Sequence, residues 1–156
     1  EERMHHKYLN EAVNITIENI ENGGRPFGAV IVKDGTIIAR AVNTMLHDHD
    51  PTAHAEMSAL RLAGKALKSV DLSGSVVYAT GEHCPMCQAA IYMAGIREVY
   101  FLFSNDDGAP YHLSTSKIVT EMKRDPNERT GFTFQEVPKA EKLNYVNLYA
   151  LWDSQQ

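Results

Sequence analysis

The only two cysteines of this chain, Cys84 and Cys87, stand three apart in the stretch EHCPMCQAA. Proline is favoured at the first position of a helix, so Pro85 predicts that Cys84 directly precedes a helix and that Cys87 lies in its first turn. Both sulfurs then lie at the positive end of one helix, where the thiolate form is favoured. The spacing therefore predicts a helix start that presents two thiolates to one metal ion, and the fold has to bring a further ligand to that place.

A candidate for the further ligand is His54, in the stretch DPTAHAEMSA. Two cysteines and one histidine, with a fourth position left for water, form one of the catalytic zinc arrangements. His54 and Glu56 can converge on one site only at a helix start, which Pro51 predicts and which Asp50 or Thr52 can cap. A glutamate beside a metal-activated water can move its protons to a leaving group. Glu56 is therefore the candidate general base.

Two other interpretations of the cysteine pair remain open at this point. A redox pair of the thioredoxin kind would not need the histidine and the glutamate. A closed structural zinc site would need a fourth protein ligand. The available side chains for that fourth position are His83, His47, His49 and Asp48.

The composition favours a soluble globular protein, because 44% of the 156 residues are hydrophobic and 22% are charged. A chain of this length predicts one domain. No apolar run is long enough to span a membrane, and the polar N-terminal stretch EERMHHKYLNEA does not resemble a secretory signal, so we expect a cytoplasmic protein. The net charge of −5 weighs against a nucleic-acid partner and favours a small-molecule substrate.

Helical and strand-like patterns alternate along the chain. The turn pair Asp34-Gly35 between two β-branched runs predicts a hairpin. Helices are expected over 2–22, 54–67, 84–94, 113–124 and 140–152, and strands over 27–33, 36–43, 75–80, 98–103 and 131–137. This alternation predicts an α/β sheet covered by helices on both faces.

The motifs HAE and CPMC, in this order and in this strand–helix context, resemble the signature of the cytidine deaminase superfamily. Within it, the chain is similar to the branch of bacterial guanine deaminases and related nucleobase and nucleoside deaminases. The resemblance runs from about Arg25 to Tyr149, through RPFGAVIVKDG, the asparagine of AVN, DPTAHAE, CPMCQAAIY and the aromatic tail. It implies a three-layer α/β/α sandwich around a mixed five-stranded sheet, as one deaminase domain over 1–156.

The resemblance also implies the chemistry. One Zn²⁺ per chain would be bound by His54, Cys84 and Cys87, and Glu56 would carry protons while ammonia leaves the ring carbon of an amino-heterocycle. Zinc lowers the pKa of its water to about 7, which makes hydroxide available at neutral pH. The substrate contacts that the resemblance implies are Phe27, Asn43, Ala55, Thr115 and Tyr149.

Two positions depart from the family pattern. His83 stands where the family has a proline, and it could be a fourth ligand, a group behind the ligands or a ring contact in the pocket. Thr115 stands where guanine deaminases of this branch carry an aspartate, and it offers one hydroxyl and no charge. Guanine is the first substrate to consider by family proximity. The tail aromatics Tyr145, Tyr149 and Trp152 would either form the packing face of a terminal helix or close over an active site.

The leading functional hypothesis is a zinc-dependent aminohydrolase that acts on a free nucleobase, a nucleoside or a similar amino-heterocycle, and the resemblance implies a homodimer. A tRNA adenosine deaminase is the enzymatic alternative. It would need a basic face and a basic C-terminal helix, whereas the tail EKLNYVNLYALWDSQQ contains one lysine. The alternative from another class is a non-catalytic zinc domain whose site His83 has closed.

Overall fold

The computed structural model describes residues 2–139 and 146–156, and it forms two compact units, one up to Lys123 and one from Arg124. The first unit contains the sheet and the predicted metal ligands. The second unit contains the C-terminal helix. That both units together form one deaminase domain stays a prediction.

The first unit is built on a four-stranded mixed sheet with the strand order β2-β1-β3-β4. Its strands are β1 (Gly28–Lys33), β2 (Thr36–Val42), β3 (Ser75–Gly81) and β4 (Glu98–Phe103). Strand β1 runs antiparallel to β2 and β3, while β3 and β4 are parallel. The parallel pair is joined through a helix, as parallel strands require.

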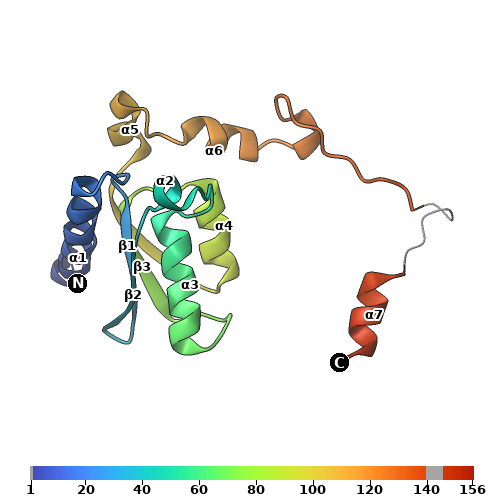
Figure 1. The fold of residues 1–156 in the computed structure, drawn as a ribbon, viewed down its shortest axis with the longest axis horizontal. Coiled ribbons are helices and arrows are strands. Elements are labelled where there is room, and N and C mark those ends of the chain that lie inside the picture. The colour runs from blue at the N-terminus through green and yellow to red at the C-terminus, as the bar shows by residue number, and fades with distance from the viewer. Residues whose placement is uncertain (1, 140–145) are drawn as a thin grey trace. The chain divides into compact units, whose positions relative to one another are not determined.

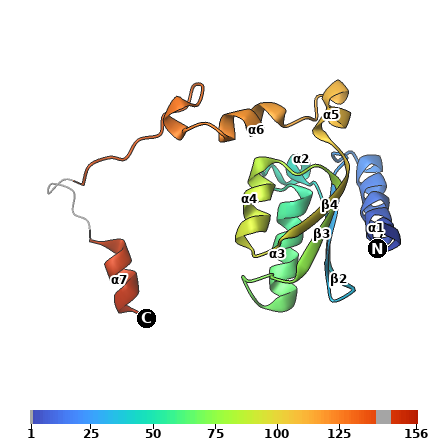
Figure 2. The same cartoon turned by 180° about the vertical axis from the view of Figure 1, so that it is seen from behind.

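Helices cover both faces of this sheet, with α1 (Glu2–Glu21) on one side and α3 (Ala55–Leu67) and α4 (Pro85–Met93) on the other (Figures 1 and 2). Alternate residues of β1 belong to different cores because side chains of a strand alternate between faces. Val30 and Val32 pack with α1, whereas Ala29 and Ile31 pack with α3 and α4. The predicted three-layer α/β/α arrangement is confirmed.

The hairpin between β1 and β2 is also confirmed. Asp34 and Gly35 both have positive φ angles, 50° and 76°, which a two-residue turn of this kind requires at its central positions. The carbonyl oxygen of Gly35 accepts a hydrogen bond of 3.0 Å from the hydroxyl of Tyr8, so the turn is fastened to α1.

The sheet has four strands rather than the five we expected, because residues 131–137 do not form a strand. The described part of the second unit contains no strand to which this segment could bind, and an unpaired strand is not stable in water. The rings of Phe132 and Phe134 stack on each other instead, with centroids 6.1 Å apart. The stretch GFTFQEV resembles a strand when it is considered alone, but this resemblance does not identify a pairing partner.

The remaining helices are short. They are α2 (Met45–Asp48), α5 (Asn105–Gly108), α6 (Ser116–Met122) and α7 (Leu148–Ser154), with single 3₁₀ turns at Ala109–Tyr111 and Pro126–Glu128. The helix expected over 140–152 begins outside the described residues, and its described part begins at Leu148. In the described part of the chain, no helix is long and apolar enough to cross a membrane.

Gly28 sits where α1 crosses the start of β1, and we expect its replacement by alanine to destabilise the protein. A β-carbon there would overlap the hydroxyl of Thr16 and lie 2.9 Å from the carbonyl oxygen of Ala12. Overpacking of this kind costs about 1–3 kcal/mol. Denaturant unfolding measures the loss, and the Thr16→Ala background should reduce it. An unchanged midpoint in Gly28→Ala would contradict this packing of α1.

Candidate metal and substrate site

His54 is placed by the turn that precedes α3. The helix begins at Ala55, and His54 is its N-cap with extended backbone angles. The expected capping by Asp50 or Thr52 is wrong, because the Asp50 carboxylate accepts hydrogen bonds from the backbone N–H and the hydroxyl of Thr52 at 2.8 and 2.7 Å. That local turn ends one residue before His54, and it leaves Glu56 in the first helical turn, as predicted.

The two cysteines are placed by the start of α4, in agreement with the prediction. Cys84 is the N-cap, Pro85 is the first helical residue and Cys87 is the third. Neither cysteine is in a disulfide; Cys84 is half-buried and Cys87 is buried. The two sulfurs therefore lie at the N-terminal end of one helix, where the helix dipole favours negative charge.

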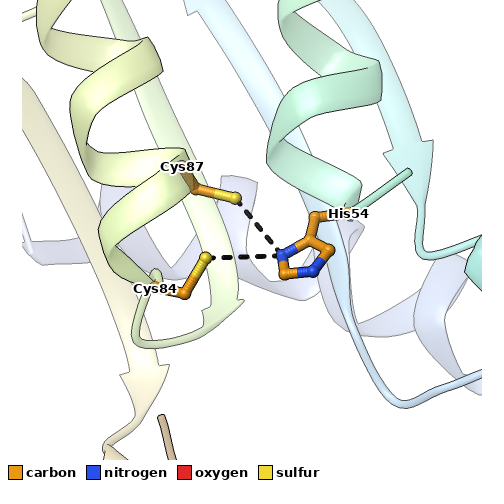
Figure 3. Close-up of side chains that lie close together, drawn as sticks. All are labelled: His54, Cys84 and Cys87. Carbon is orange, nitrogen blue, oxygen red and sulfur yellow. Dashed lines mark hydrogen bonds between the residues drawn. The ribbon is translucent and has the colours of Figure 1, made fainter. Parts of the chain in front are cut away.

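The side chains of His54, Cys84 and Cys87 converge between the starts of α3 and α4 (Figure 3). The Nδ1 atom of His54 lies 3.5 Å from each of the two sulfur atoms. Zinc bonds of about 2.3 Å to sulfur and about 2.05 Å to nitrogen, at a tetrahedral angle, would separate these atoms by about 3.6 Å. The donor set and its spacing therefore fit a tetrahedral Zn²⁺ site, and Nδ1 is the nitrogen that would bind.

The electrostatics of these three side chains also suit a cation. The hydrogen bond from Cys87, ahead of that from His54, lowers the pKa of the Cys84 thiol to about 4. The pKa of Cys87 is raised, chiefly because its thiol bonds to Cys84 and is buried. The pKa of His54 is raised, chiefly by its hydrogen bond with Cys84. The cluster thus collects negative charge and holds protons that a bound dication would displace.

Glu56 is a buried carboxyl group next to this cluster, with 7% of its surface exposed. Burial is the main cause that raises its pKa above the usual range of a glutamate. A carboxyl group whose pKa is raised in this way holds a proton more readily than an exposed glutamate does. This is the property that a proton carrier beside a metal-activated water needs.

The metal cluster opens into a cavity of about 190 Å³. The residues that line it are Arg25, Phe27, Asn43, His54, Glu56, Glu82, Cys84, His112, Leu113, Ser114 and Thr115. Three of the five predicted substrate contacts, Phe27, Asn43 and Thr115, are therefore brought to the metal cluster. Ala55 is fully buried and is not among the lining residues. Tyr149 lies on α7 in the second unit with 88% of its surface exposed, and its role stays a prediction.

The amide of Asn43 has a defined orientation. Its Oδ1 accepts a hydrogen bond of 3.1 Å from the backbone N–H of Met45, and its Nδ2 lies 3.4 Å from the sulfur of the same residue. Sulfur is a weak acceptor, so the NH₂ group keeps donor capacity for a ligand. Asn43 is 4% exposed, and its backbone N–H is bound to the carbonyl oxygen of Phe27 at 2.9 Å.

Five lining residues were not predicted as site residues: Arg25, Glu82, His112, Leu113 and Ser114. Each lies within three residues of one that was predicted, and this proximity is the signal that could have identified them. His112 also has an unusual backbone conformation, which is visible only in the structure: it is left-handed, with a φ angle of 62°. Such a conformation marks a sharp turn in the segment that forms one cavity wall.

His83 directly precedes Cys84 but is not a member of the metal-binding group. Its Nε2 is 3.4 Å from Nε2 of Gln88, and its ring meets the edge of Phe101 with centroids 6.5 Å apart. Burial lowers its pKa, which favours a neutral ring. Among the described residues, the metal-binding group contains His54, Cys84 and Cys87 alone. The proposed fourth ligand of a closed structural site, whether His83, His47, His49 or Asp48, is therefore not found in this part of the chain.

Comparisons with known proteins agree with the site. The sequence profile of the cytidine and deoxycytidylate deaminase zinc-binding region matches residues 2–103, which include all four candidate metal and proton-transfer residues. Guanine deaminase from Bacillus subtilis is 40% identical over 141 residues, which is 90% of each chain. The X-ray structure of that enzyme superposes with a TM-score of 0.86 at 38% identity, over 96% of this chain and 94% of the other.

Other relatives match a smaller part of this chain. The tRNA-specific adenosine deaminase from Agrobacterium fabrum is 47% identical over 76 residues, or 49% of this chain and 50% of that protein. The guanine deaminase structure from Nitrosomonas europaea has a TM-score of 0.66 at 26% identity and covers 69% of this chain and 63% of the other. The similarity to the Bacillus protein extends through nearly the whole chain, whereas the others match about half to two-thirds of it.

Proposed function

The chain belongs to the cytidine and deoxycytidylate deaminase family, and on this premise we propose that it releases ammonia from a free nucleobase or similar amino-heterocycle, with guanine as the first candidate. The observation that carries the proposal is that His54 and Cys84 line one small cavity together with the buried carboxyl of Glu56, while the buried Cys87 completes the metal-binding group behind them. The similarity to a guanine deaminase over 90% of both chains supports the choice of guanine.

The protein and its metal would divide the chemistry between them. His54, Cys84 and Cys87 would hold a zinc ion, which when bound would lower the pKa of a water molecule to about 7 and so would supply the nucleophile for hydrolysis at neutral pH. The helix starts of α3 and α4 hold the three ligands in place, and they leave the side facing the cavity open to a substrate.

Glu56 would carry the protons. Its carboxylate would take one proton from the attacking water and give it to a ring nitrogen. It would then take the second proton from the same oxygen as the C–N bond breaks and give it to the amine, which leaves as ammonia. Burial favours the neutral acid between these steps, because it raises the pKa of this carboxyl group. Its position in the first turn of α3, two residues after the ligand His54, keeps it beside the reaction centre.

The cavity walls would orient the substrate ring. Phe27 provides an aromatic surface, and the amide NH₂ of Asn43 provides a donor for a ring carbonyl or ring nitrogen. The cavity volume of about 190 Å³ suits a single heterocycle. Ala55 and Tyr149 remain proposed contacts on the ground of family resemblance.

Ammonia release by the zinc-loaded protein tests this proposal. The substrates are guanine, guanosine, cytosine, cytidine, isocytosine, adenine and amino-triazines. We expect turnover of guanine. Turnover of another compound of this panel instead would change the assigned substrate and would still support a deaminase. The proposal would be contradicted if a protein that holds one zinc per chain released no ammonia from any of these compounds. Salt-sensitive binding of tRNA in that case would favour the tRNA adenosine deaminase alternative.

We also propose that the protein is a cytoplasmic homodimer. Side chains on neighbouring faces of α4 and α6 expose apolar surface around one groove: Tyr92, Met93, Ile118 and Met122 are 63%, 87%, 52% and 44% exposed. A molar mass of two chains by light scattering is expected, and Met93→Lys should shift the protein toward one chain. A monomer at micromolar concentration would contradict the dimer.

A further inference from the structure

We propose that Asn105 is a positioning residue that holds the Thr115 hydroxyl as a hydrogen-bond acceptor toward the metal cavity, so that this wall selects substrates with an N–H donor. The inference rests on the proposed function, because it concerns how the same cavity recognises its ligand. Thr115 lines the metal cavity, whereas Asn105 lies behind it and does not.

The orientation of the Thr115 hydroxyl follows from two hydrogen bonds to one atom. Oδ1 of Asn105 accepts from the backbone N–H of Thr115 at 3.2 Å and from its hydroxyl at 3.3 Å. A backbone N–H can only donate, which identifies the amide atom as the oxygen. The hydroxyl next to the same oxygen must then donate its single hydrogen to it. The lone pairs of Oγ1 are what Thr115 has left for a ligand.

Asn105 is itself anchored to the strand end that leads to the metal ligands. Its backbone N–H donates a hydrogen bond of 2.9 Å to Oε1 of Glu82, two residues before Cys84. The backbone N–H of Glu82 in turn donates to the carbonyl oxygen of Phe103 at 2.7 Å. The series Glu82, Asn105 and Thr115 therefore ties the recognition wall to the elements that hold the metal cluster.

The neighbouring hydroxyl of Ser114 already takes part in two hydrogen bonds, whereas the Thr115 hydroxyl donates to Asn105 and keeps its lone pairs for a donor. The Ser114 hydroxyl donates to Oγ of Ser116 at 2.8 Å and accepts from its backbone N–H at 3.1 Å. Thr115 is the N-cap of α6, but its side chain makes no capping hydrogen bond. Its oxygen is therefore not used by the helix that follows.

An acceptor without charge has a definite chemical preference. It binds a ring N–H or an amino N–H, and it repels a carbonyl oxygen or an unprotonated ring nitrogen. A site built to bond a particular group discriminates against analogues that lack it, because the group in the site is then left unpaired. Asn43 also lines the cavity, and its NH₂ group presents a donor. The two side chains together fit a heterocycle that carries both a donor and an acceptor.

Equilibrium binding tests the inference separately from turnover. The protein is the zinc-loaded Glu56→Gln variant, and the probes are guanine, cytosine and their ring N-methyl derivatives, measured by calorimetry. We expect a base with its N–H to bind more tightly than its N-methyl derivative. Thr115→Val, which keeps the shape and removes the hydroxyl, should reduce that ratio of dissociation constants by about tenfold, and Thr115→Ser should keep it.

The role of Asn105 is tested by comparing two replacements. Asn105→Asp keeps an acceptor oxygen for both donors and should keep the ratio, whereas Asn105→Leu should reduce it as Thr115→Val does. In the Thr115→Val background, Asn105→Leu should have no further effect on the ratio. Zinc content and circular dichroism confirm that each variant is folded.

Several outcomes would overturn the inference: a ratio that Thr115→Val leaves unchanged, additive effects of the two replacements, or no binding of any probe. Ammonia release with an unchanged ratio would keep the proposed function and reject the role of Thr115 and Asn105. A ratio that depends on Thr115 without ammonia release would keep the inference and reject the proposed function.

Discussion

Replacing Glu56 by glutamine is expected to leave one zinc per chain and to lower turnover by about 10²- to 10⁴-fold, the range that general acid–base catalysis contributes. Glutamine has nearly the same size as glutamate and can fill the same buried space. It cannot take up or release a proton at neutral pH, so the amino group would have no acid to protonate it as it leaves as ammonia. Metal analysis and steady-state kinetics of the same preparation measure both effects.

A matched control separates this role from a general effect of charge in the cavity. Glu82 also lines the cavity, but its Oε1 accepts a hydrogen bond from the backbone of Asn105, and an amide oxygen can do the same. Glu82→Gln should therefore keep most of the turnover. A turnover in Glu56→Gln close to that of the unmodified protein would reject the mechanism. Equal losses in both variants would mean that the two carboxyl groups cannot be assigned different roles.

The positions of the metal ligands could be predicted because local rules determine them. Pro85 places Cys84 at a helix start, and the spacing to Cys87 then brings both sulfurs to one end of α4. His54 was predicted at a helix start as well, although the turn that places it differs in detail from the expected cap. Such features depend on a few neighbouring residues and need no knowledge of the partner helix.

The rest of the cavity depends on contacts between distant segments. Asn105, at the start of α5, and Thr115, before α6, are ten residues apart and lie in different elements, so no helical or strand periodicity predicts their hydrogen bonds. The role of Glu82 could not be predicted from the sequence either. Its hydrogen-bond partner Asn105 comes only after α4 and β4 along the chain. The prediction of a strand over 131–137 was wrong for a related reason. A sequence pattern describes a single strand, whereas a stable strand needs a second strand to pair with.

Removal of zinc is expected to abolish ammonia release and to lower the melting temperature by about 5–15 °C. The ligands lie at the starts of two helices, His54 before α3 and the cysteines at the start of α4, so a bound ion connects elements that are otherwise held by packing. An ion that binds the folded chain at 100 to 1,000 times its dissociation constant stabilises it by about 3–4 kcal/mol. For a protein of this size, each kcal/mol corresponds to about 2–4 °C.

Chelation followed by calorimetry and an activity assay measures this effect, and added Zn²⁺ should restore both readouts. Cys87→Ser and Cys84→Ser should each lose the ion without any chelator, because both sulfurs lie 3.5 Å from the same histidine nitrogen and complete one donor set. His83→Gln should keep the zinc, since the ring of His83 contacts Gln88 and Phe101 rather than the cluster. Full turnover by a chain stripped of zinc, or loss of zinc in His83→Gln, would contradict this assignment of the ligands.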